Sequence, residues 1–185
     1  QSITINSAAE YEDKLSAIGK VIADFEQRKN LIEKQLLDAA EKINGHVPVD
    51  SVLLDEVTAL VEWPVAIIGD FDPEYLEVPH EALILTMKKN QKYFPVFDND
   101  KKLLNHFITI ANIDSSNPET IPNGNDRVIR PRLADAKFFW EQDAKQTLEA
   151  RLEHLKAIVF QKQLGSIYDK SLRVSKLASH ISNLI

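Results

Sequence analysis

YFPVFDNDKKLLNHFITI, residues 93–110, is the stretch that decides the fold. It holds two runs rich in aromatic and β-branched residues, 93–97 and 103–110, separated by the turn-forming sequence Asp98-Asn99-Asp100-Lys101. This pattern predicts a β-hairpin. Pro95 has no backbone donor, so the first strand must lie at a sheet edge or at a bulge.

Upstream of the hairpin the apolar period is mostly helical. In residues 7–43 apolar side chains recur at alternating spacings of three and four, which predicts one long N-terminal helix that Asn44-Gly45 ends. Ser7 and Glu10 have the spacing of a capping box, and Gly19 in the interior favours a bend or a break. Asp50 can cap a second helix, residues 65–69 predict a short buried strand, and Pro79 suits the start of a further helix.

Downstream of the hairpin, residues 114–125 form a polar loop, and helices are predicted from about residue 126 to 144, over 148–160 and over 164–185. Together these elements predict an α+β fold that has a long N-terminal helix and further helices packed around a small antiparallel β-sheet. We expect one module in three parts: a mainly helical part at 1–62, an α+β core with a basic helix at 63–145, and C-terminal helices at 146–185.

Composition narrows the class of protein. No apolar run approaches the roughly 20 residues that would span a bilayer, so no membrane is expected. The chain has no cysteine, which excludes disulfides and thiolate metal sites and fits a cytoplasmic location. Residues 1–85 hold 17 Asp and Glu against 6 Lys and Arg, whereas residues 86–185 hold 11 against 16. This asymmetry suggests an anionic partner for the second half.

No pattern in the sequence predicts a catalytic, metal or cofactor site. The five histidines are scattered, without the spacing of metal ligands. The chain lacks a nucleophile elbow and a glycine-rich phosphate loop. The paired carboxylates Asp70 and Asp72 lie in a turn, where aspartate is expected for backbone reasons.

Basic side chains are the stronger candidates, as contacts for nucleic-acid phosphates. In the helix from Asp126, a step of 100° per residue groups Ile129, Leu133, Ala136 and Trp140 as a buried stripe. The alternative is a solvated helix face with intrahelical ion pairs. The predicted nucleic-acid-binding residues are Lys88, Lys89, Lys92, Arg127, Arg130 and Arg132.

Asparagines near the polar loop are weaker candidates. Asn112, Asn117, Asn123 and Asn125 can hydrogen-bond a ligand, but asparagine also suits turn geometry.

Several blocks, in order along most of the chain, resemble the beta subunit of bacterial glycyl-tRNA synthetase. They are DFEQRK (24–29), LLDEVTALVEWP (53–64), LEVP (76–79), MKKNQKYFPVF (87–97), HFIT (106–109), RLADAKFF (132–139) and VFQKQLGSIYDK (159–170). One departure is Pro131, which stands where that family has a small residue between two arginines. A proline inside a helix favours a kink there or a later helix start.

The resemblance implies an internal fragment of a much longer subunit of a glycine–tRNA ligase. In that family the alpha subunit carries the catalytic core, with ATP and magnesium, and the beta subunit contributes tRNA-binding modules. The implied partners are tRNA-Gly, the alpha subunit and the rest of the beta subunit. The fragment would help to bind and position tRNA; the alternatives are a subunit-assembly module and an editing-like domain.

Overall fold

The computed structural model describes residues 2–112 and 120–184, without the side chains of residues 120–123. The chain folds as two compact units, residues 1–138 and 139–185. The elements of the first unit are η1 (Ala8–Glu10), α1 (Tyr11–Lys14), η2 (Leu15–Gly19), α2 (Phe25–Glu41), α3 (Ser51–Leu60), β1 (Val65–Asp70), η3 (Pro73–Glu77), α4 (His80–Leu85), η4 (Thr86–Gln91), β2 (Phe94–Phe97), β3 (Leu103–Ala111) and most of α5 (Thr120–Ala144). Those of the second are α6 (Leu148–Arg151), η5 (Leu152–Ala157), β4 (Val159–Gln161), β5 (Gly165–Ser166) and α7 (Ile167–Ser182).

The first unit is built on an antiparallel sheet with strand order β1-β3-β2. The predicted α+β class, the strand at residues 65–69 and the hairpin are therefore confirmed. Pro95 lies in β2 at an edge of this order, and the register shifts between Pro95 and Phe97, so both predicted consequences of the proline occur. The central strand β3 pairs with both neighbours.

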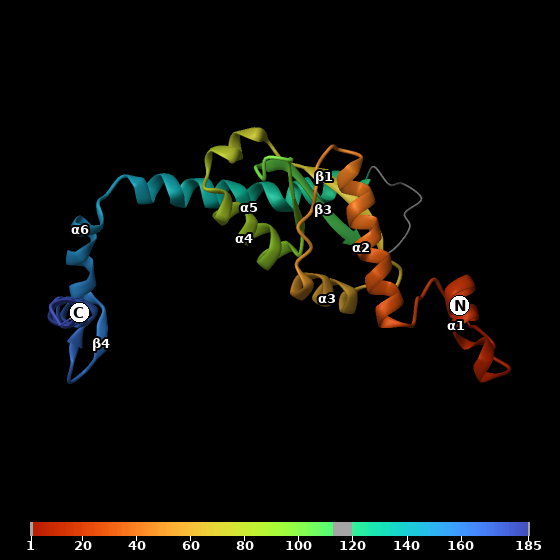
Figure 1. Ribbon diagram of the computed structural model, residues 1–185, viewed down its shortest axis with the longest axis horizontal. Coiled ribbons are helices and arrows are strands. Elements are labelled where there is room, and N and C mark those ends of the chain that lie inside the picture. The colour runs from red at the N-terminus through yellow and green to blue at the C-terminus, as the bar shows by residue number, and fades with distance from the viewer. Residues whose placement is uncertain (1, 113–119, 185) are drawn as a thin grey trace. The chain divides into compact units, whose positions relative to one another are not determined.

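Successive side chains of β3 enter two different cores, because they point to opposite faces of the sheet. Ile108, with no exposed surface, packs in a cluster with residues of α2 and α3 such as Leu36 and Leu54. Its neighbour Phe107, also fully buried, packs with Met87 of η4 and Leu133 of α5. Helices thus cover the sheet on both faces (Figure 1).

The long N-terminal helix is wrong as predicted, because the helical pattern is broken before residue 25. η2 ends at Gly19, and Lys20 adopts a left-handed backbone with φ 55°. The chain then runs without helix to Asp24, whose side chain accepts the amide of Gln27 (2.6 Å) and starts α2. Ser7 makes no capping bond to η1, so the capping box predicted there is also wrong.

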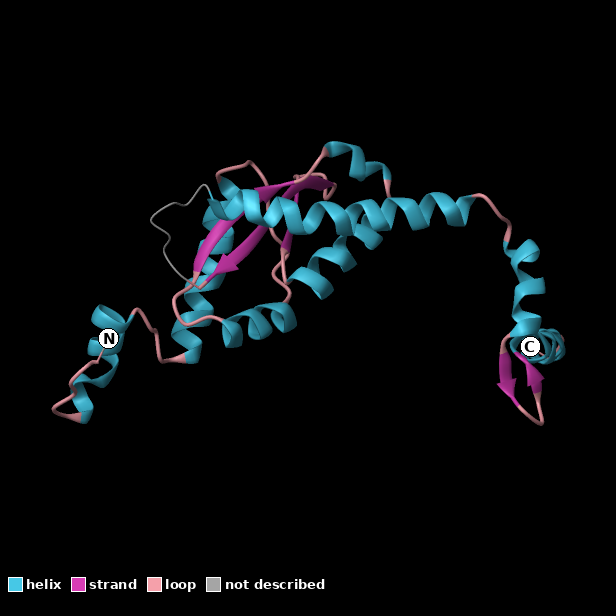
Figure 2. Ribbon diagram, turned by 180° about the vertical axis from the view of Figure 1, so that it is seen from behind, coloured by secondary structure: helices cyan, strands magenta, loops and turns pink. Residues whose placement is uncertain are grey.

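The C-terminal part of the chain differs as well. The two helices predicted over 148–160 and 164–185 are present but shorter, as α6 with η5 (148–157) and α7 (167–182), and the hairpin β4–β5 between them was not predicted (Figure 2). The start of α7 is set by a capping box between Ser166 and Asp169. Gly165, with φ 81°, allows the tight turn that precedes it.

α5 begins earlier than predicted and runs through Pro131 without an end. Pro131 is exposed, so the carbonyl that loses its helical partner can be hydrated instead. Ile129 and Leu133 are fully buried as predicted, whereas Trp140 is 40% exposed, against the prediction that it belongs to the buried stripe. Much of the predicted polar loop, residues 113–119, lies outside the described residues.

Candidate nucleic-acid interface

Three predicted basic residues lie together where η4 leads into β2. Lys88 and Lys89 belong to η4, and Lys92 follows it with a left-handed backbone, φ 59°. The Nζ of Lys88 lies 3.0 Å from Oδ2 of Asp50, and the Nζ of Lys92 lies 2.7 Å from Oε1 of Glu56. Lys89 is exposed and makes no ion pair with any residue that the structure describes. Two of the three lysines therefore tie η4 to α3.

The acceptors of these pairs are positioned by α3. Asp50 is the N-cap of α3, and its side chain accepts the amides of Val52 and Leu53. The hydrogen bond from Lys88 holds the pKa of Asp50 below its ordinary value, and the Leu53 amide acts in the same direction. Because the paired side chains are partly exposed, each such pair contributes only about 0–1 kcal/mol. A phosphate can therefore replace either carboxylate at little cost.

The other predicted cations, Arg127, Arg130 and Arg132, are exposed on α5. At 100° per residue they point in three directions around the stripe of Ile129 and Leu133, rather than forming one row. Arg130 pairs with Asp126 one turn before it. Neither Arg127 nor Arg132 makes an ion pair with another residue in the described part of the chain.

Tyr93 links the lysines at the end of η4 to the part of α5 that carries the arginines. Tyr93 follows Lys92 directly and stacks on Phe107, with ring centroids 4.5 Å apart. Its hydroxyl donates to Oδ1 of Asn125, 3.2 Å away, in the turn of α5 just before Arg127. Burial raises the pKa of the Tyr93 hydroxyl, which keeps it a donor. The two groups of cations are therefore carried by one packed core.

Lys137 holds the later part of α5 in place. Its Nζ lies 3.2 Å from Oε2 of Glu74 and 3.8 Å from Oε2 of Glu77, both in η3. With 22% of its side chain exposed, Lys137 serves the packing of α5 on η3.

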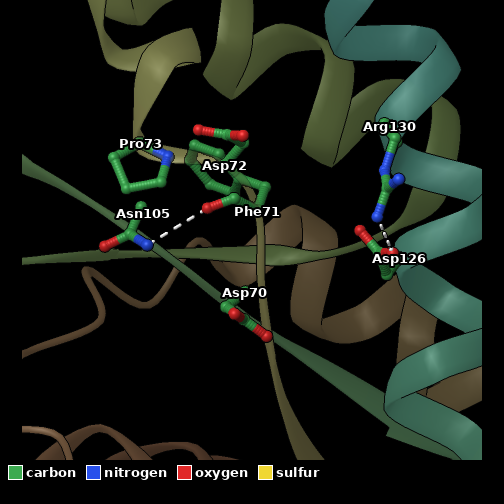
Figure 3. A pocket seen from close by; sticks show the side chains of 7 residues that line it. All are labelled: Asp70, Phe71, Asp72, Pro73, Asn105, Asp126 and Arg130. Atoms are coloured by element: carbon green, nitrogen blue, oxygen red, sulfur yellow. Dashed lines mark hydrogen bonds and ion pairs between the residues drawn. The ribbon is translucent and has the colours of Figure 1, made fainter.

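An open cleft of about 410 Å³ lies between the end of β1 and α5. Three carboxylates line it, those of Asp70, Asp72 and Asp126. Figure 3 shows the Arg130 guanidinium turned toward Asp126, and Nδ2 of Asn105 donating to the carbonyl of Phe71 (3.1 Å). Arg130 lines the cleft as well and is paired with Asp126, so Asp70 and Asp72 leave the lining net acidic.

Sequence patterns did not predict this cleft, because Asp70 and Asp126 come from distant parts of the chain. The one available signal was the pair of aspartates at residues 70 and 72. Within residues 2–112 and 120–184 no three His, Asp or Glu side chains come close enough to hold a metal ion. No helix in the same range is long and apolar enough to cross a membrane.

The asparagines have structural partners where they are described. Oδ1 of Asn112 accepts the amides of Glu62 (2.7 Å) and Trp63 (3.0 Å), and so fixes the entry to β1. Asn117, and the side chain of Asn123, lie outside the described residues. The geometry thus favours turn stabilisation for Asn112 over contact with a ligand.

Comparison with known proteins gives a consistent result. A family model described as "Glycyl-tRNA synthetase beta subunit" matches residues 1–185. The glycine–tRNA ligase beta subunit of Hahella chejuensis is 53% identical over 180 residues, 97% of this chain and 26% of that protein. The beta subunit of Pseudoalteromonas translucida is 53% identical over 182 residues (98% and 26%), and that of Pseudomonas putida W619 is 51% identical over 185 residues (100% and 27%). The chain spans about a quarter of the length of these relatives.

Proposed function

The chain belongs to the glycyl-tRNA synthetase beta-subunit family, and on that premise we propose that it binds tRNA-Gly and positions it for glycyl-tRNA synthesis. It acts in the cytoplasm as part of a glycine–tRNA ligase, with the alpha subunit and the rest of the beta subunit as protein partners. The ATP- and magnesium-dependent chemistry belongs to the alpha subunit.

The observation that carries this proposal is the exposure of cations on rigid elements of one core. Lys89, Arg127 and Arg132 are exposed, and among the described residues they have no acidic partner. Backbone phosphates of RNA are recognised by such side chains, and arginine can bind a phosphate through two parallel hydrogen bonds. These three residues make the first contacts with tRNA.

Lys88, Lys92 and Arg130 make weaker contacts with tRNA. Each already has a carboxylate partner at the surface, so contact with a phosphate is an exchange of anions rather than a new pair. Because a surface ion pair is worth only about 0–1 kcal/mol, the exchange is close to neutral. They contribute less to tRNA affinity than Lys89, Arg127 and Arg132, while Lys88 and Lys92 also hold η4 against α3.

The salt dependence of tRNA binding tests the proposal. The triple substitution Lys89→Gln, Arg127→Gln and Arg132→Gln in the full-length beta subunit, assembled with its alpha subunit, removes three positive charges. If each contacts one phosphate, the slope of log K against log salt becomes less negative by about 0.7–0.9 per residue removed. Lys34→Gln, at an exposed position on α2, is the matched control and should leave the slope unchanged. An unaltered slope and affinity in the triple variant would refute the proposal.

A second candidate, a subunit-assembly module, is favoured by apolar side chains that the first unit leaves exposed. Val52 and Leu60 of α3 are 75% and 63% exposed, and Leu85 of α4 is 60% exposed. Large apolar side chains at a surface can mark a protein interface. Substituting these three with Ser should weaken association with the alpha subunit and spare tRNA binding if assembly is the function.

A further inference from the structure

The second unit lacks a hydrophobic core of its own. None of its described residues, 139–184, is buried. Many of its large apolar side chains are at least 40% exposed, including Leu148, Val159 and Leu164 outside α7. Monomeric proteins rarely leave large apolar patches in water. Something outside this unit must therefore cover part of it.

α7 is the element whose apolar side has the clearest pattern. At 100° per residue, Val174, Leu177 and Ile181 fall on one side of α7, and Leu184 follows just beyond its last residue, Ser182; we call these four side chains the α7 stripe. Their exposed fractions are 55%, 59%, 46% and 72%. Ser179 lies on the opposite side of the helix and Lys176 on a flank, whereas Arg173 borders the stripe. α7 is thus amphipathic, with its apolar side uncovered.

Local contacts hold only the first turns of α7. Ser166 and Asp169 cap it, and the amide of Ile167 donates to the carbonyl of Ile158 (2.8 Å). Beside them the Lys170 ammonium lies over the ring of Phe160, 4.4 Å from its centroid. The stripe begins beyond these contacts. A lone helix of this length is marginal in water, since helices are stabilised mainly by burial of their apolar side.

We propose that the α7 stripe is a packing surface for a segment of the longer beta-subunit chain outside residues 1–185. The relatives are nearly four times as long as the matched region, so each has ample further chain to supply such a segment. The four side chains of the stripe are aliphatic and offer no donor for a phosphate, so the stripe itself suits an apolar partner. The partner segment presents an apolar face of its own, and Lys176 and Ser179 stay toward solvent. This inference rests on family membership and not on tRNA binding.

Hydrogen exchange on the full-length beta subunit without the alpha subunit tests the proposal. We expect the amides of residues 174–182 to be protected at least about tenfold more than in the chain of residues 1–185. Leu177→Glu and Ile181→Glu should abolish the gain. Ser179→Glu places the same charge on the opposite side of the helix and should preserve it. Unchanged protection at Ile32 and Leu36 of α2 will show that the first unit remains folded in every variant.

Other occupants give other results, and each would overturn the proposal. Protection that rises with protein concentration indicates a second copy of the chain. Protection that appears only with the alpha subunit, or only with tRNA, assigns the stripe to that partner. Equal exchange in the full-length subunit and in residues 1–185, under all of these conditions, shows that no segment outside residues 1–185 covers the stripe.

Discussion

Adding one methyl group at Gly69 should destabilise the first unit, because the ring of Phe107 occupies the space. Gly69 of β1 is paired with Phe107 of β3. A Cβ at residue 69 would lie 2.6 Å from Cε2 and 3.0 Å from Cε1 of that ring, and closer still to Cζ. Real Cβ atoms do not approach so closely, so the ring or the strand must move.

The ring has little room to move. Phe107 is fully buried and stacks on Tyr93 with an interplanar angle of 6°, and Tyr93 in turn bonds to Asn125 of α5. Overpacking of a core costs about 1–3 kcal/mol. Replacing Gly by Ala also raises the free energy of unfolding by about 0.4–1 kcal/mol, because it restricts the unfolded chain. The net expectation for Gly69→Ala is a loss of about 1–2 kcal/mol.

Thermal and urea unfolding followed by circular dichroism measure this loss. For a chain of this size we expect Tm to fall by about 2–8 °C. Gly124→Ala is the matched control, since a Cβ there meets nothing within 4 Å among the described residues and Ala is the better helix former. Adding Phe107→Leu to Gly69→Ala should recover part of the loss relative to the sum of the single changes. A Gly69→Ala protein as stable as the parent would refute the packing argument.

Three further predictions concern local interactions. Asp50→Asn should lower stability by about 0.5 kcal/mol at neutral pH, because it loses the pair with Lys88 while the cap remains. Since the pKa of folded Asp50 is lowered from 3.8, this contribution is complete above about pH 4 and disappears as pH falls through the folded pKa, which urea titrations at several pH values will show. Arg28→Met should cost about 1.5–3 kcal/mol in urea unfolding, because the guanidinium bonds to the carbonyls of Ile22 and Thr58 and fixes the break before α2. Ser166→Ala should cost about 1 kcal/mol and reduce the helical circular dichroism signal, through loss of the α7 cap; an unchanged signal would mean that the cap does not start the helix.

The sequence by itself determined the features that depend on neighbouring residues. Turn chemistry between two β-rich runs gave the hairpin, Pro95 gave the edge strand, and Asp50 gave the start of α3. Each of these is decided within a few residues, where backbone sterics and local hydrogen bonds dominate. The ordered blocks in residues 24–170 likewise identified the family without any structure.

Only the tertiary structure decided which side chains are available to bind a partner. The candidate lysines look alike in the sequence, yet Lys88 and Lys92 are paired with acids some 36–38 positions earlier in the chain, and Lys89 is not. Trp140 follows the helical period but is 40% exposed, whereas Ile129 and Leu133 of the same stripe are fully buried. A periodic pattern shows which side of a helix is apolar, but only the packing of distant segments shows whether that side is covered. For the same reason the helical pattern of α7 was visible in the sequence, but the exposure of its apolar side within the described residues was not.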